Sequence, residues 1–467
     1  MKPIRFGTDG WRAIIARDFT FANLSRVVEG TARWLRQRYE APKVALGYDC
    51  RFMAGEFAEA VAQQLAYHGV KVYLSPTFVS TPMVSLTTVQ HQTHLGIVLT
   101  ASHNPPSYLG YKLKASYGGP APVSLLREIE ALIPPEPVEV PEAWEDYLRE
   151  RQIEIYDMEA LYQNYIKSRF DLKALASLPY RIGFDAMHGA GQRIFPKLLP
   201  SVYAFRCSYN PSFGGVNPEP IPKNLGDFAQ FIREKDLDFG FVLDGDADRI
   251  GMMGPKGTYI DAHHIILLVL HYLVRYRGMK GRVILSLSCA TRVGDYARKQ
   301  GLPVEITPVG FKYIAERMQE ASDTLLGAEE SGGLALPSHL PERDGTYAAL
   351  LILQMLHETG KALPALIEEI HEVVGPFAVD RLDWHLPEAR KQEALKRLAQ
   401  NPPDRFAGRS VERIDTTDGF KLHLSDGSAI MFRASGTEPL LRIYTEAETA
   451  AQASALLTAG QEWVMSG

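Results

Sequence analysis

The sequence predicts an α/β protein that ends in a smaller antiparallel α+β domain. Helical and strand-like patterns alternate through the first three quarters of the 467 residues, which is typical of mostly parallel sheets covered by helices. In the last hundred residues strand-like segments follow one another, and Asp426-Gly427 marks a hairpin between two of them. At about 150 residues per domain, this length corresponds to about two to four domains.

The first predicted domain covers residues 1–150. Its predicted elements are, in order, a helix over 19–39, a strand over 43–48, a helix over 55–68, and strands over 70–74 and 95–99. A stretch rich in Pro and Glu over 133–141 cannot form the interior of a helix or a sheet, and a helical pattern over 157–170 follows it. We therefore place a domain boundary near residue 150.

Three further domains are predicted over 151–255, 256–375 and 376–467. The second begins with a strand over 180–184 and ends after a strand over 239–243 and its acidic loop. The third domain is predicted to contain a helix over 263–276, a strand over 283–287 and a helix over 345–357. The last is predicted to contain strands over 421–424, 429–433 and 441–445.

Composition excludes several classes of protein. The formal net charge is −5 and basic residues form no block, so we expect no nucleic-acid partner. The three cysteines are too few for a disulfide framework or a four-cysteine zinc site, which favours a reducing compartment. No apolar run reaches the roughly 20 residues that span a bilayer, so we expect a cytoplasmic protein without a membrane partner.

The most informative segment is Leu243-Asp-Gly-Asp-Ala-Asp-Arg249, in which three aspartates follow directly on an apolar strand. Asp244, Asp246 and Asp248 repel one another unless a cation neutralises them, and oxygen ligands of this kind select magnesium or calcium. An EF-hand loop would need glycine and glutamate where this chain has Arg249 and Pro255. The alternative is a solvated acidic turn.

A second segment, Leu99-Thr-Ala-Ser-His-Asn-Pro105, also follows an apolar strand, at the place where open α/β sheets bind ligands. Ser102 is a candidate nucleophile, and His103 lies beside it. No Gly-x-Ser-x-Gly motif surrounds this serine, so acyl-transfer chemistry is disfavoured. The alternative is an ordinary turn made of Ser, Asn and Pro.

Further segments offer groups that suit a sugar phosphate. Glu329 and Ser331 lie between glycines in the segment 327–333 and suit hydrogen bonding to vicinal hydroxyl groups. In Phe432-Arg-Ala-Ser-Gly-Thr-Glu-Pro439, a phosphate could be bound by Arg433, Ser435, Gly436 and Thr437. Arg12, in a glycine-rich turn, and Lys112, shortly after Ser102, add cations. Each segment taken alone could equally be a surface turn or a cap.

Together and in this order, these segments resemble the α-D-phosphohexomutase family, most like phosphoglucomutases and phosphomannomutases, over essentially the whole chain. The resemblance implies three similar α/β domains with mixed sheets and a C-terminal antiparallel α+β domain around a central cleft. It also implies that Ser102 carries a phosphoryl group and that this serine and the three aspartates hold Mg²⁺. The four domains would then contribute, in order, the phosphoserine, metal, sugar-binding and phosphate-binding loops.

The resemblance assigns roles to the remaining candidates. Arg12 and Arg249 would neutralise charge, and Lys112 together with His103 would move the proton of the reacting oxygens. Arg343, in the segment His339-Leu-Pro-Glu-Arg-Asp-Gly345, would lie near a substrate phosphate. The sequence departs from the family pattern at Ala328, where the family usually has glycine.

We therefore expect a phosphoglucomutase that interconverts glucose 1-phosphate and glucose 6-phosphate, with glucose 1,6-bisphosphate as activator and intermediate. Phosphomannomutase or dual-specificity activity and phosphoglucosamine mutase activity are close alternatives. From other classes, a magnesium-dependent sugar phosphatase would need an attacking water and no second phosphate site, and a regulatory metal-binding module would show no turnover. The partners expected are hexose phosphates, and the sequence does not determine the oligomeric state.

Overall fold

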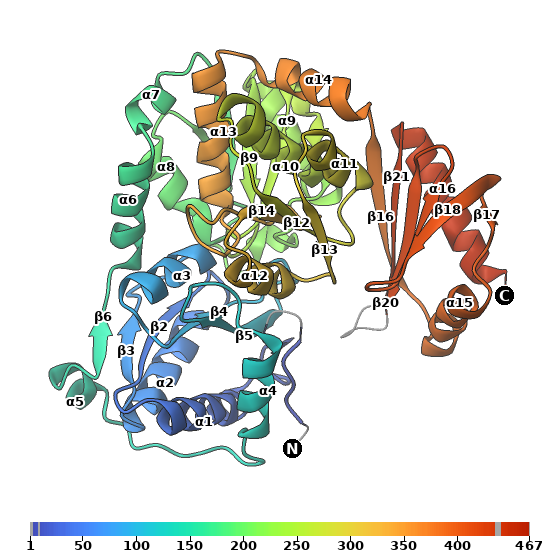
Figure 1. Ribbon diagram of the computed structural model, residues 1–467. Helices are drawn as coiled ribbons and strands as arrows, with labels where there is room; N and C mark the ends of the chain where they lie inside the picture. Colours follow the sequence, from blue (N-terminus) through green and yellow to red (C-terminus); the bar gives the residue numbers. More distant parts are fainter. Residues whose placement is uncertain (1–2, 8–9, 435–439, 467) are drawn as a thin grey trace. The chain divides into compact units, whose positions relative to one another are not determined.

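Figure 1 shows a computed structural model of the chain, which describes residues 3–7, 10–434 and 440–466. The chain forms two compact units. The first comprises Met1–Ile265, Ala315–Ser322 and Ser331–Gly360. The second comprises Ile266–Ile314, Asp323–Glu330 and Lys361–Gly467.

The first sheet of the first unit has six strands in the order β1-β5-β4-β2-β3-β6. These strands are β1 (Trp11–Ile14), β2 (Lys43–Tyr48), β3 (Lys71–Leu74), β4 (Leu95–Leu99), β5 (Tyr108–Ala115) and β6 (Ile153–Ile155). β4, β2, β3 and β6 are parallel, whereas β1 and β5 are antiparallel to their neighbours, so the sheet is mixed. The edge strand β6 comes from beyond residue 150, and the predicted domain boundary there stays a prediction.

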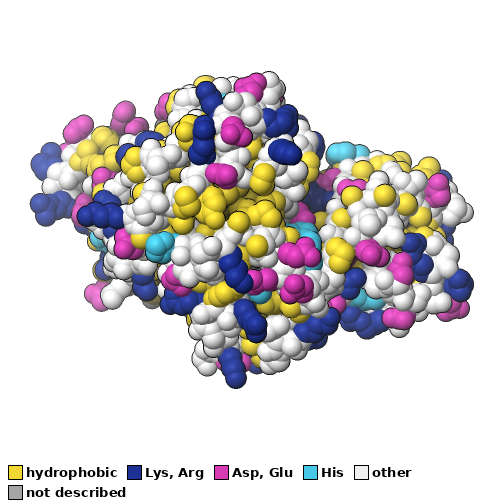
Figure 2. Space-filling view, turned by 90° about the horizontal axis from the view of Figure 1, so that it is seen from above, with side chains coloured by type: hydrophobic (Ala, Val, Ile, Leu, Met, Phe, Trp, Pro, Cys, Tyr) yellow, Lys and Arg dark blue, Asp and Glu magenta, His cyan; other side chains and the backbone are white. Residues whose placement is uncertain are grey.

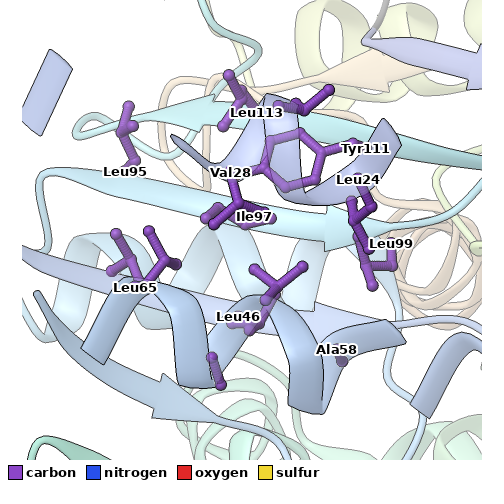
Figure 3. Close-up of a cluster of buried hydrophobic side chains, with 14 of the residues drawn as sticks. Leu24, Val28, Leu46, Ala58, Leu65, Leu95, Ile97, Leu99, Tyr111 and Leu113 are labelled. Atoms are coloured by element: carbon purple, nitrogen blue, oxygen red, sulfur yellow. The ribbon is translucent and has the colours of Figure 1, made fainter. Parts of the chain in front are cut away.

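Helices cover both faces of this sheet: α1 (Phe21–Arg38) and α2 (Ala54–Tyr67) lie on one side and α3 (Thr81–Gln90) on the other (Figure 1). Figure 3 shows the apolar core between the sheet and α1 and α2, in which Val28 and Leu65 face Leu46 and Ile97. The helices form where apolar residues recur at helical spacing. The predicted helices over 19–39 and 55–68 agree with α1 and α2 to within two residues.

The second sheet, also in the first unit, has the order β11-β10-β9-β7-β8. Its strands are β7 (Ile182–Asp185), β8 (Tyr203–Phe205), β9 (Phe239–Leu243), β10 (Ile250–Met253) and β11 (Tyr259–Ile260). β8, β7 and β9 are parallel, and β10 turns back antiparallel to β9. Helix α9 (Gly226–Glu234) packs Phe228 and Ile232 against Val242, and α13 (Gly345–Thr359) contacts β9 and β10.

The third sheet contains three parallel strands in the order β13-β12-β14, which lie in the second unit. They are β12 (Arg282–Ser286), β13 (Val304–Thr307) and β14 (Thr324–Ala328). Helix α11 (Thr291–Lys299) packs on β12 and β13 and contacts α14 (Leu363–Val374). The helix predicted over 263–276 is α10 (Ala262–His271) followed by a π-helical turn over Tyr272–Tyr276.

The fourth sheet is antiparallel throughout and has the order β16-β21-β20-β19-β18-β17. Its strands are β16 (Ala378–His385), β17 (Arg405–Phe406), β18 (Arg409–Asp415), β19 (Phe420–Leu424), β20 (Ala429–Ala434) and β21 (Leu440–Ala447). The predicted hairpin joins β19 to β20, and Gly427 has the positive φ of 78° that the turn needs. Helices α15 (Glu388–Gln400) and α16 (Ala450–Met465) cover one face, with Leu398 and Leu456 in the core.

Short elements complete the chain. The remaining helices are α4 (Val123–Ala131), α5 (Trp144–Arg149), α6 (Met158–Arg169), α7 (Leu172–Ala176), α8 (Ile194–Leu198) and α12 (Phe311–Glu320), and β15 covers Leu334–Ala335. Over the described residues, no helix has both the length and the apolar character needed to cross a membrane. On the face shown in Figure 2, basic and acidic side chains are interspersed. The predicted fold class is confirmed: three helix-covered sheets precede an antiparallel one.

Candidate active site

Ser102 lies just beyond β4, in the loop that connects this strand to β5. Its side chain is buried, and its backbone has a positive φ of 52°, a conformation that a non-glycine residue adopts only when its surroundings hold it there. Its backbone N–H donates to Thr100 Oγ1 at 2.8 Å. Its Oγ donates to Asp244 Oδ2 at 2.8 Å. The predicted aspartate segment 243–249 and the predicted serine segment 99–105 are therefore in direct contact.

Gly245 allows this close approach of the two loops. A Cβ atom at residue 245 would lie 2.4 Å from the carbonyl oxygen of Ser102. Any side chain there would push the loop of Ser102 away from Asp244. A second segment supports the aspartate loop from its other side, because Ala190 N–H donates to the carbonyl of Gly245 at 2.9 Å.

Asp244, Asp246 and Asp248 converge at the end of the buried strand β9. One carboxylate oxygen from each of the three lies within 4.8 Å of the others, and all three side chains are fully buried. Burial raises the pKa of Asp244 well above its ordinary value, and the neighbouring carboxylates of Asp246 and Asp248 raise it further. The group has the residue types and the convergence of a cation site.

The hydrogen-bond partners of these aspartates support that interpretation. Burial alone would raise the pKa of Asp246, but the Lys112 ammonium and the Thr81 hydroxyl hold it well below its ordinary range. Both groups bind the same oxygen of Asp246, Oδ2, at 2.9 Å and 2.6 Å. The buried Oδ1 atoms of Asp246 and Asp248 have no hydrogen-bond partner among the described residues. Two unpartnered carboxylate oxygens in this group fit a hard divalent cation.

Two buried cations compensate part of the negative charge. Lys112, on β5, donates to Asp248 Oδ2 at 3.2 Å in addition to its bond with Asp246. Arg343 donates from Nη2 to the same oxygen of Asp248 at 2.6 Å. Arg343 thus binds a carboxylate of the aspartate group, and its place near a substrate phosphate stays a prediction. Arg249 lies at the edge of the group, with Nε 3.9 Å from Asp248 Oδ1.

Arg12 and His103 lie around Ser102. The Nη1 atom of Arg12, on β1, donates to Asn104 Oδ1 at 2.8 Å. The Nδ1 atom of His103 lies 3.4 Å from Ser102 Oγ. Ser102, His103, Lys112, Arg12 and Arg249 all belong to the first unit, as do the three aspartates and Arg343.

The remaining candidates divide between the units. Glu329 follows β14 in the second unit and is buried, whereas Ser331 begins a segment of the first. The neighbouring Glu330 accepts hydrogen bonds from the hydroxyls of Ser286, Ser288 and Tyr444, so its carboxylate is occupied by this chain's own groups.

Arg433, on β20, donates from Nε to Asp418 Oδ2 at 2.9 Å. The same oxygen accepts the N–H of Val309 at 2.9 Å, so Asp418 links the arginine to the backbone after β13. Ser435, Gly436 and Thr437, the other members of the predicted phosphate-binding loop, lie outside the described residues.

Sequence reasoning missed two groups that support the site. Thr81, at the start of α3, holds Asp246 through both its hydroxyl and its N–H, the latter 3.0 Å from the Asp246 carbonyl oxygen. Asp49 and Arg51 follow β2 and contact the loop of Ser102. The sequence holds one signal for Asp49 and Arg51. The segment Leu46-Gly-Tyr-Asp49 resembles Ile182-Gly-Phe-Asp185, and each of these aspartates stands at or just after the end of a strand.

The chain matches models of known protein families. Four family models match consecutive parts of the chain, all described as phosphoglucomutase/phosphomannomutase. They are alpha/beta/alpha domain I over residues 3–137, domain II over 160–257, domain III over 261–373, and the C-terminal domain over 384–459.

Individual relatives extend over nearly the whole chain. A phosphoglucomutase/phosphomannomutase of Thermococcus kodakarensis is 31% identical over 466 residues, covering 97% of each chain. A phosphoglucosamine mutase of Caldicellulosiruptor bescii is 28% identical over 448 residues, covering 95% of this chain and 94% of its own. A crystal structure from Thermus thermophilus, named for a phosphomannomutase, superposes with a TM-score of 0.88 at 36% identity and covers 99% of both chains.

Proposed function

Because this chain belongs to the phosphoglucomutase/phosphomannomutase family, whose members are phosphohexomutases, we propose that it interconverts glucose 1-phosphate and glucose 6-phosphate. The observation that carries the proposal is the 2.8 Å hydrogen bond from Ser102 Oγ to Asp244 Oδ2. It puts a buried hydroxyl directly against a carboxylate group in which two oxygens have no hydrogen-bond partner within the described part of the chain. A phosphoryl group on this hydroxyl would carry nearly two negative charges beside those carboxylates.

The proposed reaction begins with Ser102 phosphorylated. The phosphorus–Oγ bond breaks as a bond forms from phosphorus to O6 of glucose 1-phosphate, and the proton of the O6 hydroxyl passes to the protein, which protonates Oγ. The product, glucose 1,6-bisphosphate, turns over in the site. Its O1 phosphoryl group then returns to Oγ, and the Oγ proton passes through the same groups to O1, which releases glucose 6-phosphate.

The proton needs an acceptor close to Ser102 Oγ. His103 Nδ1, at 3.4 Å, is near enough to take part once substrate tightens the site. Lys112 lies between Asp246 and Asp248, so its ammonium keeps these carboxylates in place and can donate toward the reacting oxygens. We propose His103 and Lys112 as the proton-transfer pair, with Arg12 and Arg249 offsetting charge on the phosphoryl group.

Asp244, Asp246 and Asp248 are the proposed ligands of Mg²⁺, together with an oxygen of the phosphoryl group on Ser102. The ion, when bound, neutralises the charge that gathers on the phosphoryl oxygens during transfer. The chain's own residues orient this group: Thr81 and Lys112 hold Oδ2 of Asp246, and Arg343 holds Oδ2 of Asp248. The Oδ1 atoms of Asp246 and Asp248 accept no hydrogen bond from the described residues and would be available to the cation.

For the remainder of the substrate we propose three contacts. Glu329 and Ser331 hydrogen-bond the vicinal hydroxyls at O3 and O4, since a carboxylate accepts two bonds and a hydroxyl can both accept and donate. Arg433 binds the phosphate that is not reacting, together with Ser435, Gly436 and Thr437. The ion pair of Arg433 with Asp418 supports this role because it fixes the direction of the guanidinium.

The sugar is the finer part of the proposal, since the relatives are named for glucose, mannose and glucosamine phosphates. Glucose and mannose share their configuration at O3 and O4, so Glu329 and Ser331 suit both, and discrimination must arise at O2. Coupled assays on the three 1-phosphates test the choice. We expect the largest kcat/KM with glucose 1-phosphate. A preference for mannose 1-phosphate by tenfold or more, about 1.4 kcal/mol, would contradict the glucose assignment and leave the mutase reaction intact.

The same assay separates a mutase from a magnesium-dependent phosphatase. A mutase converts each 1-phosphate consumed into one 6-phosphate, whereas a phosphatase releases inorganic phosphate and free sugar. We expect 6-phosphate in a one-to-one ratio and a requirement for catalytic amounts of glucose 1,6-bisphosphate. Stoichiometric release of inorganic phosphate would overturn the proposed function.

A further inference from the structure

We infer that Arg51 is a positioning residue for Ser102: its buried guanidinium sets the shape of the loop that presents the Ser102 hydroxyl to the aspartate group. The inference deepens the proposed function and rests on it. Arg51 follows β2 rather than β4 and lies 51 residues before Ser102 in the chain.

Arg51 is the centre of a hydrogen-bond network at the end of β2. Its side chain is 0% exposed, and its Nε donates to Asp49 Oδ2 at 3.1 Å. Its two terminal nitrogens donate at 2.6 to 2.9 Å to four backbone carbonyls, those of Ser102, Asn104 and Pro105 in the loop and that of Tyr108, the first residue of β5. The ring of Phe213 lies 4.9 Å from the guanidinium carbon. Every nitrogen of the guanidinium therefore has a partner, and three of its five hydrogen bonds go to the loop and one to the strand that follows it.

Asp49 reaches the same loop by a second route. Its Oδ2 accepts a hydrogen bond from Thr100 Oγ1 at 2.6 Å. Thr100 Oγ1 in turn accepts the N–H of Ser102 at 2.8 Å. The N–H of Ser102 is thus held through Thr100 and Asp49, while its carbonyl is held directly by Arg51 at 2.6 Å. Both polar groups of the Ser102 backbone are fixed by one ion pair.

This arrangement explains how the loop keeps an unfavourable backbone conformation. Ser102 has a positive φ, which is unfavourable for a non-glycine residue and persists only where the surroundings hold the backbone in place. Four carbonyls that converge on one point repel one another unless a planar donor with several N–H groups lies between them. Only arginine provides such a donor, because a lysine offers a single nitrogen at the end of a flexible stem.

The link to the reaction is geometric. Arg51 binds the carbonyl of Ser102, and Asp244 accepts from the hydroxyl of the same residue. A loop that relaxes when Arg51 is lost would move Oγ relative to the carboxylates, and a displacement of about 1 Å can cost on the order of 100-fold in rate. Substrate contacts elsewhere would be unaffected, so the loss should fall on kcat and leave KM nearly unchanged.

The test compares Arg51→Lys with Arg26→Lys in the full-length protein. Arg26, on α1, is a matched control because it is also buried and also donates to a backbone carbonyl, that of Pro134 at 2.8 Å, and its partners Pro134 and Asn23 lie outside the Ser102 loop. For both variants we would measure kcat and KM for glucose 1-phosphate, the rate of phosphorylation by glucose 1,6-bisphosphate, and amide hydrogen exchange over residues 100–111. Thr100→Val, which removes only the hydroxyl of the second route, provides a milder variant if Arg51→Lys does not fold.

We expect Arg51→Lys to lower kcat and the phosphorylation rate by about 100-fold with KM changed by less than about threefold, and to speed amide exchange in the loop by at least about tenfold. Thr100→Val should change the same quantities in the same direction, by about tenfold. Arg26→Lys should leave all of them within about threefold of wild type.

Several results would overturn the inference. They are unchanged loop exchange in folded Arg51→Lys, wild-type kcat in that variant, or an equal loss in Arg26→Lys. If Arg51→Lys does not fold, unchanged values in Thr100→Val have the same meaning. A wild-type protein that does not convert hexose phosphates would instead refute the proposed function, and the exchange measurement would still decide whether Arg51 shapes the loop.

Discussion

Two groups of buried charges in this molecule differ in how completely their partners satisfy them. In the first unit, the aspartate group at the end of β9 has two carboxylate oxygens without a hydrogen-bond partner among the described residues. In the second unit, the ammonium of Lys421 donates to the carbonyls of Leu287 and Cys289 at 3.1 Å and 2.6 Å. Glu446 accepts the N–H groups of Thr291 and Arg292 at the start of α11, at 2.6 Å and 3.0 Å.

The difference separates a structural role from a chemical one. Lys421 and Glu446 are buried charges that hydrogen-bond backbone carbonyl and N–H groups where β12 ends and α11 begins. These hydrogen bonds explain both charges without a ligand. Burial lowers the pKa of Lys421, and Glu446 partly offsets this effect. The aspartate group, by contrast, is incomplete with its protein partners alone. Substitutions in the two groups should therefore affect different measured quantities.

The largest effect is expected from Ser102→Ala, which removes the proposed acceptor of the phosphoryl group. Turnover should fall by at least about 10⁴-fold while folding is retained, because the change removes only the hydroxyl and its contacts with Asp244 and His103. Ser107→Ala, in the same loop but exposed, is the control and should keep full activity. Intact-protein mass spectrometry after incubation with glucose 1,6-bisphosphate should show one added phosphate on wild type and none on Ser102→Ala. Equal labelling of the two proteins would refute the assignment.

Removal of divalent cations should have the next largest effect. We expect chelation to lower kcat by about 10³-fold, with recovery when Mg²⁺ is restored. Asp246→Asn should abolish that recovery, because it removes one negative charge and replaces one carboxylate oxygen by an amide nitrogen, which does not bind a cation; Thr81 and Lys112 would hold the remaining oxygen. Asp236→Asn, in the exposed turn after α9, should behave as wild type. Full activity in exhaustively demetallated protein would show that the aspartate group is structural, like the group around Lys421.

A smaller effect is expected from Arg433→Ala. Loss of a charge-assisted contact to a phosphate should raise KM for glucose 1-phosphate by about 10- to 100-fold. Arg409→Ala removes an arginine of the same domain that pairs with Asp426 at the surface, and it should leave KM unchanged. The measurement is a steady-state titration of each variant. Identical KM values for Arg433→Ala and wild type would remove Arg433 from the proposed substrate site.

The smallest effect on activity, and the clearest on stability, is expected from Lys421→Met. This change leaves the carbonyls of Leu287 and Cys289 buried without a donor, which should lower the free energy of unfolding by about 1 to 3 kcal/mol. Thermal denaturation with Lys396→Met, an exposed lysine on α15, as the control measures this loss. The kcat of folded Lys421→Met should stay within about twofold of wild type. A large loss of kcat with unchanged stability would show that the comparison of the two groups is wrong.

The sequence determined those features that depend on neighbours in the chain. Continuous apolar runs predicted the strands β4 and β9, and Asp-Gly predicted the turn between β19 and β20. Three aspartates on alternate residues predicted a cation site, because charges so close in sequence cannot separate in space. The motifs and their order likewise predicted the family.

Only the tertiary structure decided which charges are buried. The sequence analysis did not predict the strand β5, because Lys112 and Lys114 interrupt its apolar pattern and lysines are usually exposed. Both lysines are buried, and their partners lie far along the chain: Asp246 is 134 residues from Lys112, and Glu342 is 228 residues from Lys114. Arg51 likewise depends on the loop 51 to 57 residues away. A buried charge is tolerable only when its partner is in place, and the fold, not the local pattern, brings that partner to it.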